Sequence, residues 1–123
     1  MPKLSILIIE DEAIIGMLLS EVLVGMGHSV IGVVGTESAA ITLAAEYKPD
    51  LLIVDAGLTS GNGISAVDAI IANRFVPHLF TTGNVLKVRL VKPDAIILEK
   101  PFHEAELIEA IDIALAQAAP LTL

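Results

Sequence analysis

The sequence has 123 residues, the usual length of one domain, with 15 acidic and 7 basic residues and a formal net charge of −8. This charge would repel a nucleic-acid backbone, and there is no basic stripe with interleaved aromatic residues, so the composition argues against nucleic-acid binding. The absence of cysteine excludes disulfides and thiolate metal sites and is consistent with a cytoplasmic protein.

Short apolar runs alternate with helical patterns along the whole chain. Such nearly continuous runs are typical of strands buried on both faces, and their alternation with helices predicts an α/β domain with a parallel sheet. The core of this single domain, 1–123, spans about 3–118 and is followed by a short C-terminal tail. In chain order, we predict a strand at 4–9, a helix at 13–26, a strand at 29–34, a helix at 37–47, a strand at 51–55, a helix at 64–74, a strand at 78–82, a helix at 84–91, a strand at 95–99 and a helix at 104–118.

The mean hydropathy of +0.79 is high enough to raise the question of a membrane. The most apolar window, 13–36, has Glu21 as its only charge, but it also contains five glycines. Its "GMGHS" segment is typical of a helix that ends at Gly27 and is followed by a new strand. We therefore expect no membrane span. The N-terminus has one lysine and no signal-like cleavage region, which argues against export.

Local signals agree with these boundaries. Thr36 stands where it can cap the second helix, and prolines precede the third, fourth and fifth strands. The three histidines, His28, His78 and His103, are dispersed near element ends, so we interpret them as surface or capping residues rather than metal ligands.

Polar side chains gather where four of the predicted strands end. In an open parallel sheet, ligands bind outside the carboxyl ends of the strands. The residues at these ends are Glu10, Asp11 and Glu12 after the first strand, Asp55 at the third, Thr81, Thr82 and Gly83 at the fourth, and Glu99, Lys100 and Pro101 at the fifth.

These strand-end residues predict a site that binds a hard cation and carries out phosphoryl chemistry. Crowded carboxylates repel each other unless they are protonated or bind a cation, and a donor set of oxygens alone favours Mg²⁺. A carboxylate beside Mg²⁺, with a lysine nearby, can act as a nucleophile toward phosphorus. Each acid also has a simpler interpretation, and Asp11 taken alone could equally be a helix cap.

The order of these motifs resembles the receiver domain of two-component response regulators, from Lys3 to about Ala118. The resemblance implies a flavodoxin-like (βα)5 fold, a doubly wound five-stranded parallel sheet of order 2-1-3-4-5. By "ILIIEDE" it implies Asp11 as a direct Mg²⁺ ligand and Glu10 as a ligand through water. By "LLIVDAGL" it implies Asp55 as the phospho-acceptor and a metal ligand, with the Gly57 carbonyl completing the metal site.

The remaining motifs imply the residues that bind the phosphoryl group. "FTTG" implies that the Thr82 hydroxyl and the Gly83 amide bind its oxygens, together with the Ala56 amide, and "LEKPF" implies that Lys100 pairs with them. A cis Lys100–Pro101 peptide is also implied. The family further implies a histidine kinase or phosphotransfer protein as donor and a downstream protein partner, whereas catalysis would be limited to the chain's own phosphorylation and dephosphorylation.

Three departures from the family pattern concern the switch. Thr59 stands where members usually have proline, and Ile97 stands where they have the aromatic switch residue. Only 18 positions separate Thr82 from Lys100, about one helical turn fewer than expected. We therefore expect a shortened fourth helix and a bistable segment at 83–94.

The first helix is apolar around most of its circumference. Most of these residues must be core, but a helix with so little polar surface beside the acidic pair could expose a docking patch. Since receivers meet the kinase through this helix, Ile15, Leu18 and Leu19 are the candidate docking residues.

Other functions remain open at this point. Haloacid-dehalogenase phosphatases also use a strand-end aspartate around Mg²⁺, but they require a second aspartate at the position of Gly57. A receiver-like module could act by protein contacts without phosphorylation, or a working receiver could serve as a phosphate sink without an effector. The segment "DAGLTSGNGISAVDAI" looks most like receivers of alphaproteobacterial stress-response systems.

Overall fold

The computed structural model describes residues 3–58 and 61–117, which form a five-stranded parallel sheet in the order β2-β1-β3-β4-β5. This confirms the predicted α/β class and strand order. The elements are β1 (Ser5–Ile9), α1 (Ala13–Gly25), β2 (Ser29–Val34), α2 (Glu37–Tyr47), β3 (Leu51–Asp55), α3 (Gly63–Asn73), β4 (His78–Thr82), α4 (Val85–Val91), β5 (Ile97–Glu99) and α5 (Glu104–Leu115). Thr59 and the tail after Gln117 lie outside the described residues.

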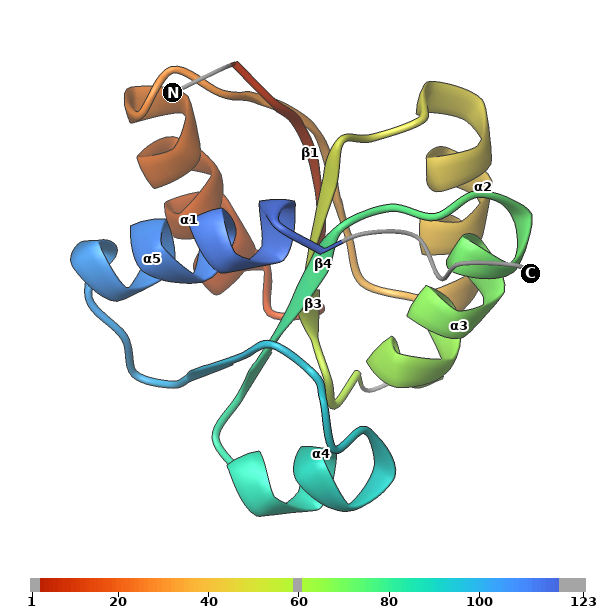
Figure 1. Ribbon diagram of the computed structural model, residues 1–123. Coiled ribbons are helices and arrows are strands. Elements are labelled where there is room, and N and C mark those ends of the chain that lie inside the picture. The colour runs from red at the N-terminus through yellow and green to blue at the C-terminus, as the bar shows by residue number, and fades with distance from the viewer. Residues whose placement is uncertain (1–2, 59–60, 118–123) are drawn as a thin grey trace.

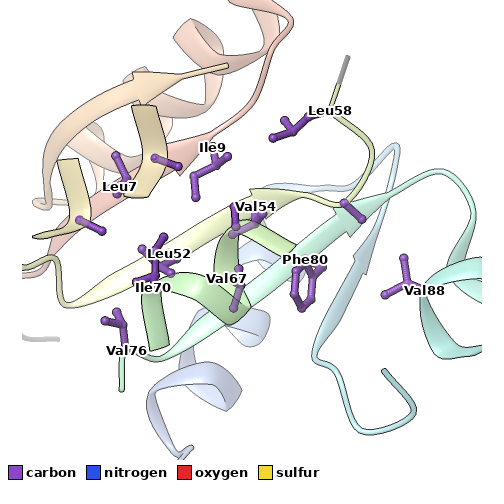
Figure 2. Packing of buried hydrophobic residues seen from close by; sticks show 14 residues of the cluster. Leu7, Ile9, Leu52, Val54, Leu58, Val67, Ile70, Val76, Phe80 and Val88 are labelled. Atoms are coloured by element: carbon purple, nitrogen blue, oxygen red, sulfur yellow. The ribbon is translucent and has the colours of Figure 1, made fainter. Parts of the chain in front are cut away.

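Two apolar layers lie on opposite faces of the sheet. Figure 1 shows α1 and α5 on one side and α2 and α3 on the other. Alternate residues of each strand serve the two layers: Leu7 and Ile9 face the layer of α2 and α3, whereas Ile6 and Ile8 face that of α1 and α5. Figure 2 shows the first layer, where Phe80 of β4 is one of the largest buried side chains. Burial on both faces explains the nearly continuous apolar runs.

Residues 3–36 follow the predicted plan. α1 ends before Gly27, whose φ of +97° suits glycine, and the Thr36 side chain accepts a hydrogen bond from the Ala39 amide at 3.2 Å. The apolar window therefore forms a helix, a turn and a strand. In residues 3–58 and 61–117, no helix is long and apolar enough to cross a membrane.

The outer strand β2 contains an irregularity. Ile6 pairs with Val30 but Leu7 pairs with Gly32, so Ile31 is an extra residue in the ladder, a β-bulge. β2 pairs only with β1 and thus forms one edge of the sheet.

The segment after β4 confirms the shortened fourth helix. α4 has seven residues and is capped by the side chain of Asn84, which accepts from the Lys87 amide at 3.2 Å. β5 begins at Ile97, not at residue 95 as predicted. The reason is that Ala95 belongs to a turn: its amide donates to the Lys92 carbonyl, and its own carbonyl accepts from the Arg89 guanidinium.

The interpretation of His28 as a surface or capping residue is wrong, because its side chain belongs to the core. It is 4% exposed, and its Nδ1 accepts a hydrogen bond from the Leu4 amide at 3.1 Å. This bond ties the turn after α1 to the start of β1. Nε2 is also buried and has no hydrogen-bond partner among the described residues. His103, by contrast, does stand at the N-cap of α5.

Candidate functional site

Three carboxylates meet at the carboxyl ends of β1 and β3. Glu10, Asp11 and Asp55 each place an oxygen within 4.8 Å of the other two. Glu10 is the most enclosed, with a side chain that is 4% exposed, whereas that of Asp55 is 11% exposed. The predicted acidic site is therefore assembled by the fold.

Lys100 is the cation of this site. Its Nζ lies 3.1 Å from Glu10 Oε1 and 3.4 Å from Asp55 Oδ2, so one ammonium is shared by two carboxylates. Burial by itself would lower the pKa of Lys100, but the hydrogen bond to Glu10 and the charge of Asp55 outweigh it and raise the pKa above its ordinary value.

Glu10 is buried beside a second carboxylate. Its pKa is raised, first by burial and then by its closeness to Asp55, despite the opposing hydrogen bonds from the Glu12 amide and Lys100. One ammonium does not offset three crowded carboxylates. Because oxygen donors are what Mg²⁺ prefers, the donor set fits a divalent hard cation.

The backbone after β3 orients the Asp55 carboxylate. Gly57 donates its amide to Asp55 Oδ1 at 3.0 Å. The Ala56 amide, predicted to face the phosphoryl position, donates instead to the Thr81 carbonyl at 3.0 Å. A backbone nitrogen has one hydrogen to donate, so the prediction for Ala56 does not agree with the structure. The Gly57 amide is the donor beside the acceptor oxygen, while the role of the Gly57 carbonyl stays a prediction.

Thr82 and Gly83 follow at the end of β4. Thr82 is 9% exposed, and its Oγ1 accepts from the Asn84 amide at 2.9 Å, which leaves the hydroxyl hydrogen to be donated. Gly83 is exposed and has open space where a side chain would lie. The Lys100 amide donates to the Thr82 carbonyl at 2.9 Å, and the Lys100–Pro101 peptide is cis, as predicted.

Ile97 occupies the position of the missing aromatic switch. It is half-buried, pairs with Phe80 in the ladder, and packs against the layer of α2 and α3. Its branched side chain is held at the sheet and offers no ring that could turn toward Thr82.

Three residues that sequence reasoning missed hold the loop after Asp55. Asn62 caps α3 by accepting from the Ile64 amide at 2.7 Å, and its own amide donates to Glu37 Oε1 at 3.2 Å. Gly63 lies against the acceptor strand so closely that a Cβ there would stand 2.0 Å from the Asp55 carbonyl oxygen. Asparagine before an apolar helix is a capping signal, but nothing local indicates the Glu37 contact.

A cleft opens beside the acceptor carboxylate. It has a volume of about 520 Å³ and lies between the start of α3 and α4, with Asp55 and Thr82 in its wall. Asp55 therefore borders a space large enough to admit a further group.

The docking residues predicted on α1 are only partly accessible. Ile15 is 37% and Leu18 is 53% exposed, and both line a groove of about 210 Å³ that continues to Phe102 before α5. Leu19, in contrast, is 9% exposed and packs in the layer of α1 and α5. The prediction of an exposed Leu19 is wrong because α1 buries the side that carries Leu19 and Leu23.

Comparison with known sequences matches the response regulator receiver domain over residues 6–112. The chain belongs to this family. This receiver is 36% identical to the transcriptional regulatory protein PdtaR of Mycobacterium tuberculosis over 121 residues, which cover 95% of the chain and 59% of PdtaR. It is 38% identical to the phyllosphere-induced regulator PhyR of Methylorubrum extorquens over 115 residues, or 89% of the chain and 43% of PhyR.

Solved structures agree with the sequence comparison. The solution structure of the receiver domain of Erythrobacter litoralis PhyR matches with a TM-score of 0.85 at 31% identity, covering 98% of this chain and 97% of that domain. The receiver spans about half the length of the two curated relatives. The chain has Gly57 where a haloacid-dehalogenase phosphatase would need its second aspartate. Because the chain belongs to the receiver family, the phosphatase interpretation is set aside.

Proposed function

We propose that this receiver accepts a phosphoryl group on Asp55 and signals through protein contacts. The observation that carries the proposal is the position of the Asp55 carboxylate, 3.4 Å from Lys100, grouped with Glu10 and Asp11, and open to the cleft. A nucleophile toward phosphorus needs this combination of access and neighbouring positive charge.

The reaction is a displacement at phosphorus. An oxygen of Asp55 attacks the phosphorus of a phosphohistidine, the new O–P bond forms, and the N–P bond breaks with its electron pair returning to the imidazole. Thr82 donates its hydroxyl hydrogen to a phosphoryl oxygen and the Gly83 amide donates to another, while the Gly57 amide stays on the Asp55 carboxylate. Lys100 moves its interaction from the carboxylates toward the new negative charge.

Glu10, Asp11 and Asp55 are the residues that would hold Mg²⁺, with the Gly57 carbonyl as a further oxygen donor. Bound there, the ion supplies positive charge that offsets both the crowded carboxylates and the phosphoryl oxygens. The nearness of Asp55, which after burial is the second cause of the raised pKa of Glu10, supports this assignment.

The donor would be a histidine kinase or a histidine phosphotransfer protein in the cytoplasm. The proposed docking patch for the helices of this donor consists of Ile15 and Leu18 of α1, the helix that follows the acidic pair. We also propose that 1–123 functions as one receiver domain and that an unidentified downstream protein reads its state.

Intact-mass analysis after incubation with acetyl phosphate tests the proposal. A gain of about 80 Da, one phosphoryl group, that requires both Mg²⁺ and Asp55 is expected in the wild type and absent from Asp55→Asn. No adduct at any quenched time point would contradict the proposal. It would instead favour a module that works by protein contacts alone, for which Ile97 and the short α4 are the supporting features.

A further inference from the structure

The cleft beside Asp55 is lined by a cation that the proposed reaction does not use. Besides Asp55, Thr82 and Gly83, its wall includes Lys87 and Val88 of α4. Lys87 is the one lysine or arginine among the described residues that line this cleft, and Lys100 lies outside it. A phosphoryl group on Asp55 would enter a cleft that the helix carrying Lys87 also lines.

The other two cations of this segment are already engaged. Arg89 donates to the Pro93 and Ala95 carbonyls, and Lys92 pairs with Asp68 of α3 at 2.8 Å. Within residues 3–58 and 61–117, the ion pairs formed by lysine are those of Lys92 and Lys100, so the exposed Lys87 ammonium takes part in none.

The charge-balancing groups assigned so far, Lys100 and the proposed Mg²⁺ site, lie with Glu10 and Asp11, and none of these three residues lines the cleft. A phosphoryl group on Asp55 carries about −1.5 to −2 at neutral pH, but its formation uses up the single charge of the carboxylate, so the site gains about −0.5 to −1. Lys100 is a single positive charge and is already shared between Glu10 and Asp55. A second ammonium, from a residue that lines the same cleft as Asp55, would offer charge to the phosphoryl oxygens that Lys100 does not bind.

We propose that Lys87 is a second phosphoryl-binding cation, whose ammonium closes onto the phosphoryl group of Asp55 and draws α4 toward the site. This inference rests on the proposed function. Lys87 then has a positioning role, because the charge on Asp55 acts on α4 through the Lys87 side chain.

α4 is suited to such a movement because little buried apolar surface holds it. It has only seven residues and a single buried one, Val88. Its outer surface carries Leu86 and Leu90, which are 70% and 77% exposed. A pull on Lys87 would therefore change how these two leucines are presented to a partner, without any movement of Ile97.

The test uses fluoroberyllate, a phosphoryl mimic, with Mg²⁺ on four proteins of residues 1–123: wild type, Lys87→Gln, Lys87→Arg and Lys92→Gln. NMR titration gives the dissociation constant and the amide shifts of 84–91. We expect Lys87→Gln to weaken binding roughly three- to tenfold, the range for one exposed charge-assisted contact, and to suppress the shifts of Leu86 and Leu90. Lys87→Arg keeps the cation and should retain both responses.

Lys92→Gln is the matched control, because it removes a cation from the end of the same helix that does not line the cleft. It should bind like the wild type. If Lys87→Gln also binds with wild-type affinity and shows wild-type shifts, the inference is overturned. If the wild type itself neither binds fluoroberyllate nor gains a phosphoryl group, the proposed function fails, and the inference fails with it.

Discussion

Lys100 lies closer to Glu10 than to the proposed phospho-acceptor. Its Nζ is 3.1 Å from Glu10 Oε1 and 3.4 Å from Asp55 Oδ2. A lysine described only as the partner of the phosphoryl group is thus also the partner of the buried acid. Because one ammonium serves both, any charge added at Asp55 competes with Glu10 for it.

The first prediction concerns Glu10 and pH. Its raised pKa means that the fold favours the protonated carboxyl, so its stabilising contribution is complete below the usual value of 4.5 and is lost as pH rises through the folded-state pKa. Without Mg²⁺, Glu10→Gln should therefore be more stable than the wild type at pH 7, with the difference shrinking toward acidic pH. Urea denaturation in EDTA at several pH values measures this.

Added Mg²⁺ provides the control for that experiment. A cation that binds only the folded state stabilises it, so the wild type should gain more stability from Mg²⁺ than Glu10→Gln does. If the difference in unfolding free energy between the two proteins stays constant across pH, the raised pKa does not belong to Glu10.

The second prediction concerns the contact between Gly63 and the acceptor strand. Gly63→Ala places a Cβ 2.0 Å from the Asp55 carbonyl oxygen and 2.9 Å from Val54 Cγ1, so backbone must move. We expect a loss of about 3 kcal/mol in the free energy of unfolding and slower phosphorylation. Gly25→Ala is the control: it lies in α1 with no atom within 4 Å and should stabilise by about 0.5–1 kcal/mol. Equal effects would show that the close contact is unimportant.

The third prediction separates docking from stability on α1. Ile15→Ser with Leu18→Ser removes exposed apolar surface, so phosphotransfer from a histidine kinase should slow while phosphorylation by acetyl phosphate continues unchanged. Leu19→Ala instead opens the core and should cost about 2–4 kcal/mol in unfolding free energy. Transfer rates that are equal for the wild type and the double variant would exclude this patch as the docking site.

The fourth prediction concerns the bond between Glu37 and the Asn62 amide. Glu37→Ala removes the acceptor, so hydrogen exchange at that amide should accelerate about three- to tenfold, the usual range for one hydrogen bond. Glu37→Gln keeps an oxygen acceptor and should exchange nearly as slowly as the wild type. Unchanged exchange in Glu37→Ala would mean that the loop is held without this carboxylate.

Much of the fold and site could be predicted because strand ends carry their own signals. Asp55 and Lys100 follow buried apolar runs, and parallel strands bring such ends to one edge of the sheet. The sharing of Lys100 with Glu10 could not be predicted, since the two residues lie 90 positions apart and several acids compete for the lysine. The three-dimensional arrangement of the strand ends decides that pairing.

The sequence did not predict the buried face of α1 or the hydrogen-bond partners of the Ala56 amide and of His28. α1 is apolar on almost every side, so its sequence does not tell which face is buried and does not distinguish the buried Leu19 from the exposed Leu18. The partner of the Ala56 amide depends on how far the pairing with β4 continues past Asp55. His28 resembles a turn residue in sequence, but its Nδ1 serves a strand that begins far away in the chain.

The bulge at Ile31 has a consequence for how molecules meet one another. A regular outer strand offers an evenly spaced row of amides and carbonyls on which a further chain can assemble, as in fibrils. In β2 that row is interrupted at Ile31, and the opposite border, β5, has only three residues. Neither outer strand provides a long, even template. A protein rich in apolar strands can therefore be present at high concentration without its sheets joining edge to edge.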